Sequence, residues 1–302
     1  MTIKKAIVTG SCGFLGQNLI KSLIENNIFV YGFDLVNDSP IKHELYMYQK
    51  CDIEKNEFSL IEDLRNSDVI FHFAWNGVHS DYRDDYYRQE KNIPSLLNTL
   101  SFAKKNNIKR IIIPGSSSEY AESEMPINGN NKFTPIDAYG TIKACCHLIA
   151  QEWSIKNNIP LILVIPSSIY GPGRDDNNIL TYTIKTLLKN EKPSFTPLEQ
   201  KWDYLYIDDY IRALLLIAEN GVSGKCYPCG FGVAKELSEY IKIIKNAINP
   251  FLELVIGDRP YKGTKPDNSI IDNSELEKDT GFKPRVSFED GIKRTIDWIK
   301  NT

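Results

Sequence analysis

The chain lacks the biases that indicate an unusual class of protein. Its 302 residues include 18 glycines and 15 prolines, too few for a fibrous or low-complexity chain. Lys and Arg number 36 against 39 Asp and Glu, so no basic excess indicates a nucleic-acid or anionic-membrane partner. No apolar run approaches the roughly 18 residues of a membrane-spanning helix. With 42% hydrophobic and 25% charged residues, the composition is that of an ordinary globular protein.

Cysteine is also sparse. Six cysteines in 302 residues do not make the dense framework of a small secreted domain. The pair Cys226-Tyr-Pro-Cys229 lacks the second pair that a zinc site needs, so we expect no metal. The two lysines near the start are followed by only four residues before Gly10, too few for the apolar part of a signal peptide. We therefore expect a reduced, soluble, cytoplasmic protein with neither nucleic acid nor membrane as partner.

Short apolar segments alternate with longer segments of helical periodicity in the first half of the chain. Strands are predicted at residues 6–9, 28–33, 69–73, 111–113 and 161–165, and helices at about 15–25, 85–105 and 138–156. This alternation is typical of an α/β fold, in which helices cover both faces of a parallel sheet. We expect a Rossmann-like, doubly wound parallel sheet.

The pattern becomes irregular after Pro166. Helices are predicted at about 209–219, 234–247 and 288–300, and segments near 202–207 and 225–229 are expected to return to the sheet. We expect a dinucleotide-binding domain at residues 1–168, completed by return segments near 202–230. Residues 169–201 and 231–302 would form a smaller substrate lobe.

A glycine-rich loop lies between the first predicted strand and helix. It reads Gly10-Ser-Cys-Gly13-Phe-Leu-Gly16. Glycines at this spacing permit a tight turn, close approach of a pyrophosphate and close packing of helix on strand. The helix N-terminus adds unpaired N–H groups and the positive end of its dipole. Asp34 closes the second strand, where a carboxylate accepts from ribose hydroxyls and repels a 2′-phosphate, which favours NAD over NADP.

Weaker signals point to the same cofactor. Asp52, followed by Ile53, ends the next apolar segment and could reach the adenine, although it could equally cap a helix. Phe73-Ala74-Trp75 ends the fourth strand, where the small Ala74 would let backbone lie against a cofactor. Core packing explains this tripeptide almost as well.

Tyr139 and Lys143 are four residues apart on a predicted helix and therefore share a face. A free phenol has a pKa near ~10, so proton transfer near neutral pH requires about 4 kcal/mol of preferential phenolate stabilisation. A lysine ammonium and a positively charged nicotinamide have the right sign to supply it. Taken alone, such a pair is more often a solvated helix face. A strand ending in Gly115-Ser-Ser-Ser-Glu-Tyr120 precedes it, and its serines can bond a substrate oxygen.

These features in this order resemble the extended, sugar-nucleotide-modifying branch of the short-chain dehydrogenase/reductase superfamily. The resemblance spans nearly the whole chain and includes Tyr170-Gly-Pro-Gly173 and Tyr206-Ile-Asp-Asp209. It implies Tyr139 as the acid–base group, Lys143 on the nicotinamide ribose, and a serine on the substrate oxygen. Ser116 and Ser117 both remain candidates for that serine. Further cofactor contacts are expected at Cys12, Phe14, Leu15, Asn92 and Pro166.

The resemblance also implies a nucleotide-diphosphate sugar as substrate. Its phosphates are expected at Arg174, Arg259 and Lys262, because N–H donors suit phosphate oxygens. Trp202 stands where the family commonly has Arg, which leaves it free to stack on the base. Other candidate substrate contacts are His79, Ser118 and Glu119. Asp208 and Asp209 are predicted as helix caps.

The reaction is left with alternatives. The turn lacks the Asp-Glu pair of the family's dehydratases, and the modest chain length favours a C4 reductase of a nucleotide-linked 4-keto-6-deoxyhexose, for surface-polysaccharide synthesis. The alternatives are a C4-epimerase that retains NAD and a non-catalytic dinucleotide-binding protein. The family implies a homodimer that pairs the helices at 85–105 and 139–156.

Overall fold

The computed structural model describes residues 1–60, 64–123, 125–174, 176–260 and 270–302. Seven strands form one parallel sheet in the order β11-β6-β5-β4-β1-β2-β3. Their bounds are β1 (Lys5–Thr9), β2 (Phe29–Asp34), β3 (Tyr46–Lys50), β4 (Val69–His72), β5 (Ile111–Pro114), β6 (Leu161–Pro166) and β11 (Cys226–Cys229). The order reverses direction between β1 and β4, which creates a crevice at the carboxyl edge of the sheet. The Rossmann-like fold predicted from the sequence is confirmed.

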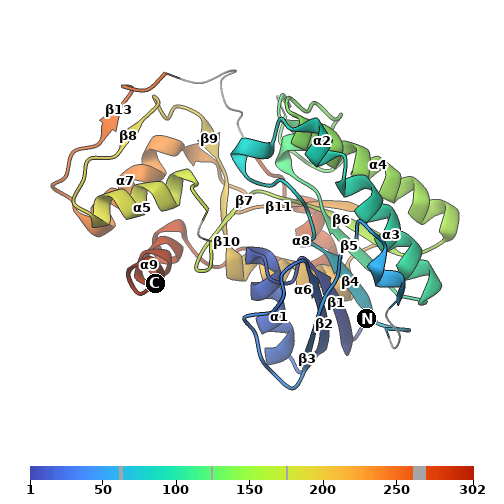
Figure 1. The fold of residues 1–302 in the computed structure, drawn as a ribbon. Helices are drawn as coiled ribbons and strands as arrows, with labels where there is room; N and C mark the ends of the chain where they lie inside the picture. Colours follow the sequence, from blue (N-terminus) through green and yellow to red (C-terminus); the bar gives the residue numbers. More distant parts are fainter. Residues whose placement is uncertain (61–63, 124, 175, 261–269) are drawn as a thin grey trace.

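Helices cover both faces of this sheet (Figure 1). In β1, Ala6 and Val8 pack into the same core cluster as Leu19 of α1 (Phe14–Glu25) and residues of α6 (Ile207–Asn220). Ile7 points to the opposite face and joins the cluster of α3 (Asn92–Lys105) and α4 (Ala138–Asn157). Successive strand residues face opposite sides, so apolar residues in consecutive positions bury both faces.

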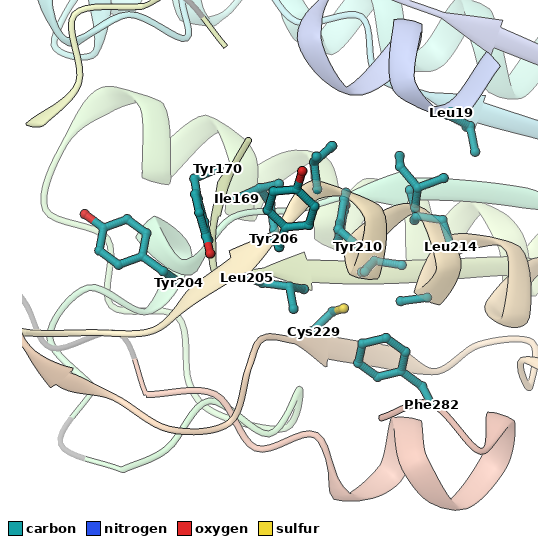
Figure 2. Packing of buried hydrophobic residues seen from close by; sticks show 14 of the residues in the cluster. Leu19, Ile169, Tyr170, Tyr204, Leu205, Tyr206, Tyr210, Leu214, Cys229 and Phe282 are labelled. Atoms are coloured by element: carbon teal, nitrogen blue, oxygen red, sulfur yellow. The ribbon is translucent and has the colours of Figure 1, made fainter. Parts of the chain in front are cut away.

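Most of the remaining elements gather beside the carboxyl edge of the sheet (Figure 1). They are β7 (Ser168–Tyr170), α5 (Ile179–Leu188), β8 (Ser194–Phe195), β9 (Lys201–Trp202), β10 (Tyr204–Tyr206), β12 (Lys235–Glu236), α7 (Leu237–Ile248), β13 (Val255–Ile256) and α9 (Phe288–Lys300). Helix α8 (Ser274–Thr280) instead packs on α6 and β11, beside the main sheet (Figure 1). Tyrosines join them to the sheet: Tyr170, Tyr204 and Tyr210 lie in one buried cluster with Leu19 (Figure 2). The cluster is continuous from α1 to α9, so the two parts share a core.

The structure corrects several element predictions. The single helix expected at 85–105 is two, α2 (Tyr86–Gln89) and α3. The Asn92 side chain bonds the carbonyl of Gln89 at the break, and Pro94 lies in the first turn of α3, where its missing N–H costs nothing. The segment near 202–207 does not rejoin the main sheet, because β10 pairs with β7 instead. The return at 225–229 is confirmed by β11. Helices α5 and α8 were not predicted.

The predicted capping role of Asp208 and Asp209 is wrong. Helix α6 begins earlier, with Tyr206 at its N-cap position. Asp209 is 2% exposed and accepts hydrogen bonds from the backbone N–H groups of Arg285 and Val286. It therefore fastens the segment before α9 to α6. In the described part of the chain, no helix is both long and apolar enough to cross a membrane.

Candidate active site

The glycine loop joins β1 to α1 at the carboxyl edge of the sheet. Gly10 has φ +66°, a left-handed conformation that favours glycine. A Cβ there would lie 2.8 Å from the backbone nitrogen of Ala74, at the end of β4. At Gly16 a Cβ would collide with the backbone of Gly10 and Ser11. Both glycines are therefore required by close backbone packing, as the sequence predicted.

The start of α1 has the donors that a pyrophosphate needs. Gly13 is the N-cap residue, and among the described residues no side chain caps this helix end. The first N–H groups of α1 are thus open to a phosphate. Asp34 accepts from the backbone N–H of Cys12 through Oδ2 (2.8 Å) and of Leu35 through Oδ1 (2.7 Å). These bonds fix the carboxylate beside the loop, with lone pairs left for ribose hydroxyls. The loop, the helix end and the acid together fit a dinucleotide.

Other predicted cofactor residues lie around this edge in different environments. Ala74 donates its N–H to Thr9 Oγ1 (3.2 Å), so the backbone at Phe73–Ala74 lies against the loop. Ile53 is 5% exposed, and Asp52 forms an ion pair with Lys55 (3.0 Å). Phe14, Leu15 and Pro166 are half-buried.

Asn92, predicted as a cofactor contact, has a structural role in the loop that follows β4. Its side chain is 3% exposed, accepts from the backbone N–H of Asn76 (2.7 Å) and donates to the carbonyls of Asn76 (3.0 Å) and Gln89 (2.9 Å). Asn92 therefore holds the loop that follows β4.

Tyr139 and Lys143 lie in the first turns of α4. Asp137 caps this helix by accepting from the N–H of Gly140 (2.6 Å). Lys143 Nζ donates to the carbonyl of Pro114 (3.0 Å) at the end of β5. The same Nζ lies 3.7 Å from the Trp75 ring centroid and 5.9 Å from that of Tyr139. Trp75 and Tyr139 rings meet edge to face at 5.8 Å. The structure thus brings the phenol, the ammonium and the end of β4 together.

The serine turn lies between β5 and α4. Ser116 caps the short helix η3 (Ser117–Tyr120) by accepting from the N–H of Ser118 (3.2 Å). An accepting hydroxyl keeps its own proton to donate. A Cβ at Gly140 would collide with the carbonyl of Ser118, so η3 packs directly on the turn that carries Tyr139. Ser116 and Ser117 are both half-buried beside this contact.

The prediction that Glu119 contacts substrate is wrong. Its side chain is fully buried. Oε1 accepts from the N–H of Ser116 (2.6 Å), and Oε2 lies 2.9 Å from Nδ1 of the buried His147. Both carboxylate oxygens are therefore occupied in holding the serine turn against α4.

Arg83 is the site residue that sequence reasoning missed. Its Nε donates to Asp137 Oδ2 (2.8 Å) and its Nη2 to Ser118 Oγ (2.6 Å). Its guanidinium carbon lies 4.4 Å from the Tyr139 ring centroid. The sequence did offer one signal for Arg83: it follows β4, and the loops after the strands of a parallel sheet carry the binding site. Ser118, a predicted substrate contact, is held by this arginine.

The cations predicted to bind phosphate are distant from one another in the sequence, and each described one bonds a different partner. Arg174 donates to both carboxylate oxygens of Asp176 and to the carbonyl of Ile169. Arg259 is exposed and its Nε bonds Ser194 Oγ (2.7 Å). Lys262 lies outside the described residues.

His79 is exposed and Trp202 is half-buried in β9. Within the described residues, no group of three or more His, Cys, Asp or Glu side chains could hold a metal.

A doubly wound sheet with this loop and a Tyr–Lys pair at its carboxyl edge defines an NAD-dependent enzyme of the extended short-chain dehydrogenase/reductase type. Residues 6–230 match the model of the NAD dependent epimerase/dehydratase family. The chain belongs to this family.

Relatives and solved structures agree with this assignment. A putative UDP-glucose 4-epimerase of Methanocaldococcus jannaschii is 26% identical over 98% of both chains. The UDP-glucuronate 4-epimerase of Thermodesulfobacterium geofontis is 27% identical over 97% of this chain and 95% of its own. The crystal structure of a UDP-glucose 4-epimerase from Thermotoga maritima with UDP-glucose has a TM-score of 0.89 at 24% identity, covering 98% of this chain and 99% of that chain. This last likeness shows the shared fold.

Proposed function

We propose that the protein is a nucleotide-sugar 4-epimerase that retains NAD and inverts the C4 hydroxyl of a UDP-linked hexose. The observation that carries the proposal is the contact of Tyr139, Lys143 and the serine turn at the cofactor edge of the sheet. Two relatives that carry 4-epimerase names and align over nearly the whole of this chain support this reaction over reduction of a 4-keto sugar.

Tyr139, Lys143 and a serine would each have a different role at the sugar hydroxyl. Tyr139 Oη takes the hydroxyl proton as the C–H bond breaks and returns it when the configuration has inverted. Lys143 stabilises the phenolate and orients the nicotinamide ribose. Ser116 is held by its hydrogen bonds with the N–H of Ser118 and the carboxylate of Glu119. Its hydroxyl donates to the sugar oxygen, and Ser117 is the alternative donor. NAD, when bound, supplies the hydride acceptor. Burial of Tyr139 and Lys143, at 8% and 9% exposure, keeps water from the proton.

Reduction of a 4-keto sugar is the second candidate. The same phenol can donate its proton to a keto oxygen, and the sequence Trp75-Asn76-Gly-Val-His79 after β4 resembles that of deoxysugar reductases. The argument from chain length loses its force, because the putative epimerase of M. jannaschii aligns over 98% of both chains. The relatives therefore favour the epimerase.

One experiment separates the two. The purified protein is denatured, and the small molecules it releases are identified by mass spectrometry. A second portion is incubated with UDP-glucose, UDP-glucuronate and UDP-N-acetylglucosamine without added nicotinamide. An epimerase releases NAD and forms a C4 epimer of one of them. Apo protein that instead consumes NADH with a nucleotide-linked 4-keto sugar would establish the reductase.

Elements outside the main sheet are proposed to bind the nucleotide. The lobe of residues 169–201 and 231–302 contains Arg174 and Arg259, and Trp202 directly follows its first segment. Arg174 would exchange part of its pairing with Asp176 for a phosphate oxygen, and Trp202 would stack on the base. A surface-polysaccharide role for the product belongs to the same proposal.

A homodimer through α3 and α4 is also proposed. Leu148 and Ile155 are 53% and 80% exposed on α4, and Leu97 is 41% exposed on the neighbouring α3. Apolar side chains on adjacent helices are typical of an interface. We expect the protein itself to sediment as a dimer and the double variant Leu148→Glu/Ile155→Glu to sediment as a monomer. The control Phe251→Glu, at a position 92% exposed and outside these helices, should leave the dimer intact.

A further inference from the structure

Lys143 is a nearly buried cation without an acidic partner. The residue is 9% exposed. Among the described residues, its Nζ has one hydrogen-bond acceptor, the carbonyl of Pro114 at the end of β5 (3.0 Å), and no carboxylate forms an ion pair with it. A cation withdrawn from water needs further partners, because one hydrogen bond replaces only part of its hydration. The groups on the other side of Nζ therefore determine where the ammonium is held.

Trp75 supplies the other partner. Its indole ring lies 3.7 Å from Lys143 Nζ, measured to the ring centroid, which is well inside the range of about 6 Å for a cation–π contact. Of the aromatic side chains, indole binds a cation most strongly in this way. The same ring meets that of Tyr139 edge to face, with 5.8 Å between the centroids. The ammonium thus lies between the end of β5 and an aromatic side chain that follows β4.

Gln89 of α2 fixes the orientation of this indole. Its side chain is fully buried. Oε1 accepts from Trp75 Nε1 (3.0 Å), and Nε2 donates to the carbonyls of Gly77 (2.6 Å) and Tyr82 (2.9 Å) in the loop after β4. Turning the indole away would leave the buried Oε1 without this donor, which costs free energy. The loop and α2 together therefore keep the ring beside Lys143.

We propose that Trp75 is a positioning residue for Lys143, whose ammonium it holds where the nicotinamide ribose binds. The inference rests on the proposed function for one point, the ribose as the ligand of Lys143. An ammonium has three N–H donors, and the bond to Pro114 uses one of them. Lys143 can therefore bind a ribose hydroxyl without leaving the indole. Because the lysine is already ordered by the indole, less side-chain freedom is lost when the ribose binds.

The test compares two ligands that differ by that ribose. ADP lacks it, and ADP-ribose carries it without the nicotinamide. Binding of each is measured by isothermal titration to the intact chain after charcoal has removed any bound NAD. Trp75→Leu should weaken the binding of ADP-ribose about tenfold, the size of a cation–π contact withdrawn from water, and leave ADP unchanged. Trp75→Phe keeps an aromatic face and should bind ADP-ribose only about threefold more weakly than the original protein.

Lys143→Met completes a double-mutant cycle. In that background the indole has no ammonium to hold, so Trp75→Leu should weaken ADP-ribose binding no further. A role of Trp75 in packing alone would cost the same affinity in both backgrounds. Trp153→Leu is the matched control, since Trp153 is also half-buried, lies on α4 and packs against the same core cluster as Trp75. It should leave the affinity for both ligands unchanged.

Three results would overturn the proposal. The first is unchanged or tighter binding of ADP-ribose by folded Trp75→Leu, the second a loss that persists in the Lys143→Met background, and the third an equal loss for ADP. If Trp75→Leu fails to fold, Trp75→Phe decides in the same two backgrounds, with its threefold loss expected only where Lys143 is present.

Failure of the proposed role of Lys143 gives a different result. Lys143→Met would then bind ADP-ribose as tightly as the original protein, because the ammonium would not touch the ribose, and both statements would fall. If Lys143→Met loses affinity for ADP-ribose and Trp75→Leu does not, the proposed function stands and the inference about Trp75 alone is wrong.

Discussion

The cofactor loop and the proton-transfer cluster are built from different groups. The loop uses backbone N–H donors of residues 10–16 and the carboxylate of Asp34, and glycine conformation fixes it. The cluster uses side chains from separate segments, with Trp75 and Arg83 after β4, Ser118 after β5 and Tyr139 in α4. A site built from backbone groups depends on a few glycines, where a Cβ would not fit. A site built from side chains depends on each charged group and each hydrogen bond that holds those side chains in place.

The difference has a consequence for variants. Within the loop, a substitution acts by sterics and is severe only where a Cβ has no room. Within the cluster, one lost charge or hydroxyl alters the proton transfer while the fold survives. The two regions can therefore be damaged independently, and the following variants test that separation.

The largest effect is expected from Tyr139→Phe. Removing the hydroxyl should lower kcat by about 10³-fold, because acid–base groups contribute roughly 10²- to 10⁴-fold. Thermal stability and bound NAD should remain at wild-type levels, since the aromatic contacts with Trp75 and Arg83 survive. Steady-state kinetics and a calorimetric Tm check this. A tenfold loss or less would show that the phenol is not the proton-transfer group.

Gly10→Ala should lower the affinity for NAD. The left-handed backbone costs a non-glycine residue about 1–2 kcal/mol, and the new Cβ would press on Ala74. We expect a loss of NAD affinity on the order of 30-fold, if about 2 kcal/mol is expressed in binding. Gly224→Ala is the control: its φ is also left-handed, at +83°, but it lies outside the loop and its Cβ would meet nothing within 4 Å, so NAD affinity should be unchanged. Equal losses by isothermal titration would contradict the steric account.

The last prediction concerns the pH dependence of stability rather than activity, and it involves His72, which connects the two regions. Its Nδ1 lies 2.9 Å from Thr9 Oγ1, and Thr9 Oγ1 also accepts from Ala74. Burial, and then the Lys143 charge, lowers the pKa of His72 to about 3. Because the unfolded chain binds this proton below about pH 6.5, the free energy of unfolding should fall as pH falls from 6.5 towards 3. The slope from this one residue is about 1.4 kcal/mol per pH unit.

His72→Asn should remove that component of the slope, because asparagine can accept from Thr9 without titrating. Urea unfolding between pH 4.5 and 7 measures it. His43→Asn, at an exposed position, is the control and should retain the wild-type slope. Identical slopes for the protein and His72→Asn would contradict the assignment.

Local patterns made the cofactor loop predictable. Gly10, Asp34 and the alternating elements follow rules of turn, strand and helix that act over a few residues. The same holds for Tyr139 and Lys143, which share a helix face by spacing alone. The fold and the position of these residues could thus be predicted from the sequence.

The remainder of the site depends on tertiary contacts. Arg83 reaches Tyr139 across 56 positions in the sequence, and no local pattern pairs them. Glu119 appeared suited to substrate, yet its pairing with His147 on α4 buries it. Likewise, the β10 segment has strand composition, but only the fold determines that it pairs with β7 rather than the main sheet.

The central claim is that the phenol of Tyr139 moves the hydroxyl proton of a bound nucleotide sugar whose C4 hydrogen leaves and returns. The most direct measurement uses a nucleotide hexose carrying deuterium at C4, incubated with the purified protein without added nicotinamide and analysed by NMR. The account predicts inversion of the C4 hydroxyl with deuterium kept on C4 of both epimers, and none of this with Tyr139→Phe. Loss of deuterium to solvent, or equal conversion by Tyr139→Phe, would contradict it.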